Sequence, residues 1–119
     1  MSELKDHPQI TELMETLDKN DMHREKKEVE ALVDYIGDME KTLTEMLKEM
    51  QSMRLEINLI HNNTLRAKCQ NLVQKTDGKI RQALSVVGKV KDNLIKSAAN
   101  AVKAFKEKGK EAFKRRSTP

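Results

Sequence analysis

The sequence predicts an all-α protein, built as a long helical hairpin or a coiled coil with a short N-terminal helix. The only prolines of the 119-residue chain are Pro8 and Pro119, so the stretch between them lacks the strongest helix breaker. Good helix formers dominate that stretch. Because 37% of the residues are hydrophobic and 35% are charged, there is little apolar material for a globular core. Extended helices that each bury one narrow face are therefore expected.

The first element is a short helix within residues 1–20. Asp6 is placed to cap it, and Pro8 suits its first turn because a residue there needs no hydrogen-bonded amide. Apolar residues then recur at helical spacing on one face: Ile10, Leu13, Met14 and Leu17. The sequence Lys19-Asn20-Asp21 is expected to end this helix.

Residues 21–62 are predicted to form an acidic heptad helix. Its apolar residues alternate in steps of three and four, which is the spacing of a coiled-coil seam. A partner helix is expected to cover that seam, either from the same chain or from another one. The predicted interaction seam consists of Val29, Leu32, Ile36, Met39, Leu43, Met46, Met50, Met53, Ile57 and Ile60.

Residues 63–119 are predicted to form a basic amphipathic helix after a hinge near Asn62 and Asn63, since residues of this type prefer caps and turns. Gly78 lowers helix stability, so a kink or a second turn is expected near residues 76–78. From Ile80 to Phe113 the apolar spacing averages near 3.6 residues, which is typical of a straight amphipathic helix. The end from Lys106 to Pro119 is expected to fray.

The net charge differs strongly between the first half of the chain and its C-terminal third. Residues 1–62 hold 8 Lys/Arg and 15 Asp/Glu, a net charge of −7, whereas residues 79–119 hold 12 and 3, a net charge of +9. Three interpretations of the basic helix stay open: it packs on the acidic helix, lies on an anionic membrane surface, or contacts nucleic-acid phosphates. The predicted basic face consists of Lys89, Lys96, Lys103, Lys110 and Lys114.

No catalytic, cofactor or metal site is predicted. The single cysteine, Cys69, and the three histidines are isolated, and they match no metal-ligand spacing. There is no Gly-rich phosphate loop and no nucleophile motif. A lone cysteine also excludes an internal disulfide and fits a reducing, cytoplasmic setting. We therefore expect neither an enzyme nor a small-molecule binder.

Three blocks, at residues 28–46, 57–75 and 91–110, follow one another in an order that resembles an uncharacterised family of small helical proteins. That family is found in bacterial genomes and mobile elements. The resemblance covers most of the chain and implies a bacterial, cytoplasmic protein. It supplies no activity and no functional residue.

The function expected from these observations is that of a non-enzymatic helical scaffold or adaptor acting through coiled-coil interactions. Its partner is another protein or a second copy of the chain, bound through the predicted seam. The alternative is a peripheral binder of anionic surfaces, either membrane lipid or nucleic acid, that uses the basic amphipathic helix. The sequence leaves open whether the two long helices pair within one chain or between chains.

Overall fold

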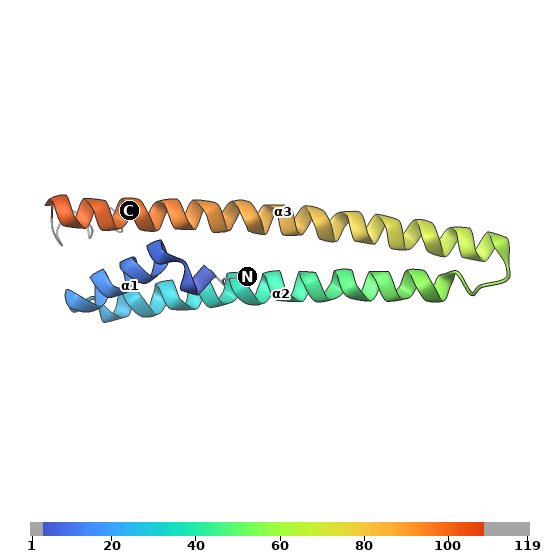
Figure 1. The fold of residues 1–119 in the computed structure, drawn as a ribbon, viewed down its shortest axis with the longest axis horizontal. Helices are drawn as coiled ribbons and strands as arrows, with labels where there is room; N and C mark the ends of the chain where they lie inside the picture. Colours follow the sequence, from blue (N-terminus) through green and yellow to red (C-terminus); the bar gives the residue numbers. More distant parts are fainter. Residues whose placement is uncertain (1–3, 109–119) are drawn as a thin grey trace. The chain divides into compact units, whose positions relative to one another are not determined.

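The computed structural model describes residues 4–108, and these form helices joined by short turns (Figure 1). In chain order they are a 3₁₀ turn η1 at Leu4–Asp6, α1 at Pro8–Lys19, α2 at His23–Ile57 and α3 at Asn63–Lys108. No strand occurs within residues 4–108. The predicted all-α class is therefore confirmed.

His7, and not Asp6, caps α1. The Nδ1 atom of His7 accepts a hydrogen bond from the amide of Gln9 at 3.1 Å, and Pro8 takes the first helical position. Asp6 belongs to η1 instead, where the amide of His7 bonds back to the carbonyl of Leu4 at 3.0 Å. An imidazole nitrogen can thus replace the usual Ser or Asp oxygen as the acceptor for an otherwise unpaired helix amide.

The α1 helix ends at Lys19, as predicted, in a compact C-terminal motif. Asp21 adopts a left-handed conformation with φ of 58°. The amide of Met22 donates a hydrogen bond to the carbonyl of Leu17 at 2.9 Å, and the amide of Asp21 donates one to the carbonyl of Asp18 at 3.3 Å. This is the hydrogen-bond pattern of a Schellman motif. Met22 and Leu17, which flank the motif, are both buried.

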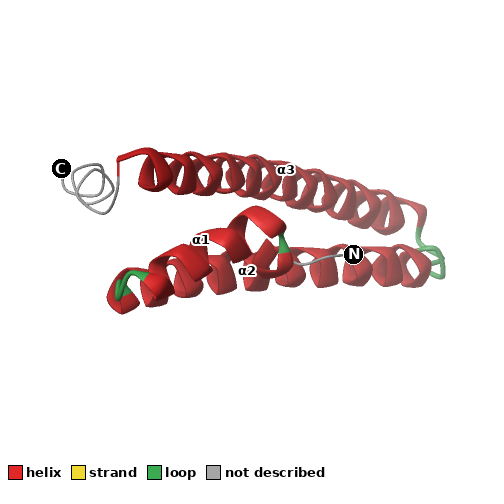
Figure 2. Ribbon diagram, turned by 60° about the vertical axis from the view of Figure 1, so that its left-hand side comes forward, coloured by secondary structure: helices red, strands yellow, loops and turns green. Residues whose placement is uncertain are grey.

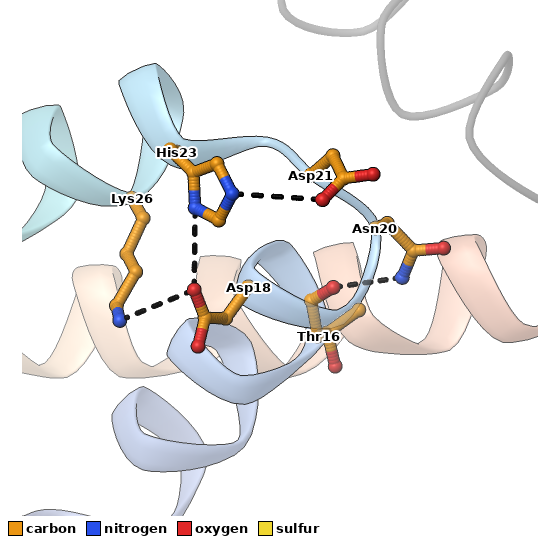
Figure 3. Close-up of polar contacts among 6 residues, drawn as sticks. All are labelled: Thr16, Asp18, Asn20, Asp21, His23 and Lys26. Atoms are coloured by element: carbon orange, nitrogen blue, oxygen red, sulfur yellow. Dashed lines mark hydrogen bonds and ion pairs between the residues drawn. The ribbon is translucent and has the colours of Figure 1, made fainter.

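Polar contacts connect α1 to the start of α2 (Figure 3). The Asp18 carboxylate lies 3.3 Å from Nδ1 of His23 and 3.5 Å from Nζ of Lys26, while Asp21 lies 3.6 Å from Nε2 of His23. Asn20 donates a hydrogen bond to the carbonyl of Thr16 at 2.7 Å. These side chains are largely exposed, so each pair contributes little on its own.

The α2 helix ends at Ile57, earlier than the predicted boundary at residue 62. Residues 58–62 form the turn, and the Oδ1 atom of Asn62 accepts from the amide of Leu65 at 3.0 Å, which caps α3. The side chain of Arg66 reaches back to the carbonyl of Ile60 at 3.0 Å. The predicted turn residues are thus present, but the chain leaves the helix before them.

The α3 helix is unbroken from Asn63 to Lys108, so the expected weak point at residues 76–78 does not interrupt it. A Cβ atom added at Gly78 would meet nothing within 4 Å. Residues 106–108, where fraying was expected to begin, are helical. Residues 109–119 lie outside the described part of the chain, and with them lie Phe113, Lys110 and Lys114.

The chain divides into two compact units. The first, here called the terminal unit, comprises residues 4–37 and 89–108 of the described chain. It contains α1, the start of α2 and the end of α3, and its core includes Ile10 and Leu17, which are fully buried, together with Val33, Ile36, Ala98 and Val102. Lys106 of α3 forms an ion pair of 2.8 Å with Glu12 of α1.

The second unit, Asp38–Gly88, is here called the hairpin unit. It consists of the rest of α2, the turn at 58–62 and the start of α3, which run side by side in both ribbon views (Figures 1 and 2). The apolar residues buried in it are Ile57, Val73, Ile80 and Val87. The last three are spaced seven residues apart, as in a heptad.

Candidate interaction surface

The ten residues of the predicted seam fall into two groups in the structure. Ile36 and Ile57 are buried, and Val29, Leu43, Met50 and Ile60 are half-buried. The other four are exposed, with exposed fractions between 38% and 46%: Leu32, Met39, Met46 and Met53. Only part of the predicted seam is therefore covered by the chain itself.

The row of residues that α2 buries, here called the buried stripe, differs from the predicted seam. Every second member of the buried stripe is the residue that follows the seam residue in the sequence. The buried stripe shares positions 29, 36, 43, 50 and 57 with the predicted seam, but it takes 33, 40 and 47 in place of 32, 39 and 46. Position 54 would continue the same spacing, but Arg54 there is exposed. Both sets alternate in steps of three and four, so both satisfy the heptad rule. Val33 is 2% exposed while its neighbour Leu32 is 46% exposed, which shows the displacement most clearly.

The displacement leaves a row of methionines on the surface of the hairpin unit, here called the methionine stripe: Met39, Met46 and Met53. Successive members are seven residues apart, so they lie above one another on one side of α2. Exposed large apolar residues also occur on α3 of the same unit, at Leu65, Leu72 and Val86.

Asp77 is the polar residue that the hairpin unit buries, with 7% of its surface exposed. Its Oδ2 atom accepts a hydrogen bond from Nε of Arg81 at 2.8 Å and lies 3.4 Å from a guanidinium nitrogen of Arg54. Arg54 lies at the edge of the buried stripe of α2 and is itself exposed. The pair thus joins α2 to α3, and the two arginines provide charged partners for the buried carboxylate of Asp77.

The pKa of Asp77 is lowered from its ordinary value of 3.8. The hydrogen bond from Arg81 is the main cause, and the positive charges of Arg81 and Arg54 add to it, while burial acts in the opposite direction. The folded state therefore favours the carboxylate more than the unfolded chain does.

This lowered pKa predicts how the stability of the protein depends on pH. The contribution of Asp77 should be fully present above pH 3.8 and should be lost as the pH falls through the lower pKa of the folded state. In urea titrations of the wild type and Asp77→Asn at neutral and strongly acidic pH, the variant should lose less stability on acidification. Asp38→Asn, an exposed change in the same unit, is the control. Equal losses in wild type and Asp77→Asn would contradict this assignment.

On the basic helix, Lys89, Lys96 and Lys103 are exposed and are spaced seven residues apart. The other two members of the predicted basic face, Lys110 and Lys114, lie outside the described residues. The apolar stripe of this helix is covered within the terminal unit, where Ala98 and Val102 are buried. Leu94 and Phe105 are half-buried.

Within residues 4–108, no group of three or more His, Cys, Asp or Glu side chains is arranged to hold a metal ion. Cys69 is a free, half-buried thiol. None of the described helices combines the length and the hydropathy that crossing a bilayer requires.

Comparison with known proteins gives a family but no function. No curated protein and no solved structure shows significant similarity to the chain. A model of a family of unknown function, DUF6674, matches residues 6–118. This range contains all the helices from α1 to α3 and all three sequence blocks at residues 28–46, 57–75 and 91–110. The chain therefore belongs to DUF6674, a family of unknown function.

Proposed function

We propose that the chain is a non-enzymatic helical scaffold or adaptor that binds a further protein helix through the methionine stripe. The observation that carries this proposal is the exposure of Met39, Met46 and Met53 at intervals of seven residues. A row with this spacing stays aligned with a second helix when the two supercoil. Methionine side chains adapt their shape to a partner, which suits an exchangeable contact.

A second candidate function is binding to an anionic surface through Lys89, Lys96 and Lys103, which are exposed in a row on α3. Such a row attracts lipid headgroups or nucleic-acid phosphates. A helix that lies in a membrane interface also inserts apolar residues. Because Ala98 and Val102 are buried within the terminal unit, the scaffold function has the stronger support.

We place this scaffold in the bacterial cytoplasm. The single cysteine, Cys69, is a free thiol, and a protein without disulfides suits a reducing compartment. The bacterial setting, and an association with mobile elements, rest on the resemblance described above. A coiled-coil mode of binding follows from the spacing of the methionine stripe.

Site-specific crosslinking tests the scaffold function. A photo-reactive amino acid that replaces Met46 should give discrete covalent adducts in living cells, because a partner helix covers that position. The same amino acid at Gln51, an exposed position on the opposite flank of α2, is the matched control and should give few. Equal labelling at both positions, or none at Met46, would overturn the proposal.

A further inference from the structure

The two long flanks of the hairpin unit differ in chemistry, and each flank contains residues from both helices. A shallow groove on one flank is lined by Arg54, Asn58, Gln70 and Gln74. On a helical wheel these residues lie on one side of the buried stripe of α2 and on the matching side of the buried stripe of α3. The groove on this flank is polar, and the exposed Leu55 lies at its outer edge.

The opposite flank is apolar. On α2, Asn58 lies on one side of the buried stripe, and the methionine stripe lies on the other. On α3, the buried residues are Val73, Ile80 and Val87. Gln74 lies on one side of this row, and Leu72 and Val86 lie on the other. Because the groove shows which sides of the two helices coincide, the methionine stripe and the exposed Leu72 and Val86 share the opposite face. We call it the apolar face.

The charges beside the apolar face are complementary between the two helices. In the hairpin unit, residues 38–62 hold 3 Lys/Arg and 5 Asp/Glu, a net charge of −2, and residues 63–88 hold 5 and 1, a net charge of +4. Next to the methionine stripe, Glu49 and Glu56 each follow a stripe residue by three positions. On α3, Lys79 continues the row of Leu72 and Val86 at seven-residue intervals. These three charged residues are exposed.

Glu49, Glu56 and Lys79 form no ion pair within residues 4–108. An acidic rim on one helix and a lysine on the other are thus both available on the same face. A surface of this kind complements itself when it is rotated by half a turn. The occupant that fits it is therefore a second copy of the chain, with α2 of one copy opposite α3 of the other.

We infer that the hairpin unit forms a symmetric homodimer through the apolar face, giving a four-helix bundle. This inference rests on the proposed function and names its partner helices. With the two-fold axis parallel to the helices, neighbouring helices of the two copies run antiparallel. The Arg54–Asp77 ion pair of 3.4 Å sets the levels along the hairpin. Because α2 and α3 are antiparallel, Lys79, two residues after Asp77, lies level with residue 52, two residues before Arg54. A two-fold axis parallel to the helices keeps this level in the other copy, so Lys79 faces the stretch between Glu49 and Glu56 of that copy.

The size of the face is consistent with a reversible dimer. Two helical segments of about 20 residues, each about 30 Å long and packed about 10 Å apart, offer a face on the order of 600 Å². Stable specific interfaces bury roughly 800 Å² on each partner. The apolar face lies near the lower end, so the dimer should dissociate on dilution.

Sedimentation equilibrium of the full chain across a range of concentrations tests the dimer. At high concentration the wild type should approach twice its chain mass of 13.7 kDa, and it should approach that chain mass on dilution. Met46→Glu should stay monomeric with unchanged helicity, because Met46 is exposed in the single chain. Gln51→Glu adds the same charge to the polar flank and should dimerise as the wild type does.

A charge exchange tests which helices meet. Lys79→Glu should weaken the dimer at least about tenfold in dissociation constant, because it faces Glu49 and Glu56 of the other copy. Adding Glu56→Lys should restore much of the loss. A monomeric wild type at all concentrations, or Met46→Glu dimerising normally, would overturn the dimer. An absent rescue by Glu56→Lys would overturn the α2-to-α3 pairing. If Met46 crosslinks to a different protein while the purified chain is monomeric, the dimer fails and the scaffold function stands.

Discussion

Val33→Asp should unfold the terminal unit, whereas Leu32→Asp should leave it folded. Val33 is 2% exposed and Leu32 is 46% exposed, although the two are neighbours on α2. A carboxylate at position 33 would be buried without a partner, which typically costs about 3–5 kcal/mol in the free energy of unfolding. That is a large share of the roughly 5–15 kcal/mol available to a small protein. At position 32 the carboxylate stays in water, and a smaller cost of about 1–1.5 kcal/mol is expected from lower helix propensity and lost partial burial.

Urea denaturation followed by circular dichroism measures this difference. The two variants introduce the same charge one position apart, so helix propensity and net charge are matched closely. If Leu32→Asp were the more damaging change, the buried stripe would follow the seam predicted from the sequence. The displaced stripe that includes Val33 would then be wrong.

The comparison between Val33 and Leu32 also shows what the sequence could predict. The helices, their order and the heptad spacing of α2 follow from the sequence, because spacing and helix propensity are local properties. The identity of the buried side does not. The set with Leu32 and Met46 is more apolar than the set with Val33 and Arg54, so the sequence favours residues that the single chain leaves exposed.

The reason lies in α3. Arg54 of α2 lies at the edge of the buried stripe, where its side chain stays 45% exposed and Asp77 of the other helix pairs with it at 3.4 Å. The two residues are 23 positions apart in the sequence, and nothing in the spacing of either helix links them. Asp77 belongs to the segment at 76–78 that the sequence marks as weak. Asp77 also lies four residues after Val73 and three before Ile80, and an acid within this apolar row is the signal in the sequence for a charged partner.

The end of α2 is harder to predict than its spacing, because it also depends on contacts between the two helices. Asn62 and Asn63 were identified as turn residues, and Asn62 does cap α3. The end of α2 at Ile57 depends instead on the turn at 58–62, where Gln70 of α3 donates a hydrogen bond to Asn58 at 3.3 Å. Contacts of this kind form only when the two helices are already side by side.

The same reasoning applies to the basic helix, where Val102→Asp should strongly lower the thermal midpoint and Lys103→Glu should not. Val102 is 4% exposed, so a carboxylate there disrupts the core of the terminal unit by about 3–5 kcal/mol. Lys103 is exposed, and its reversal should change the stability by no more than about 0.5 kcal/mol.

Vesicle binding completes this test, because the two candidate functions make opposite predictions for Val102. If the apolar stripe of α3 is needed for packing, the folded wild type should bind anionic vesicles weakly, and Lys103→Glu should remove what binding there is by weakening the attraction to lipid headgroups. Thermal melts and co-sedimentation with vesicles of anionic and neutral lipid measure both properties.

A Val102→Asp variant that melts like the wild type but no longer binds anionic vesicles would mean that the stripe contacts lipid. The surface-binding function would then replace the scaffold as the better explanation of this helix.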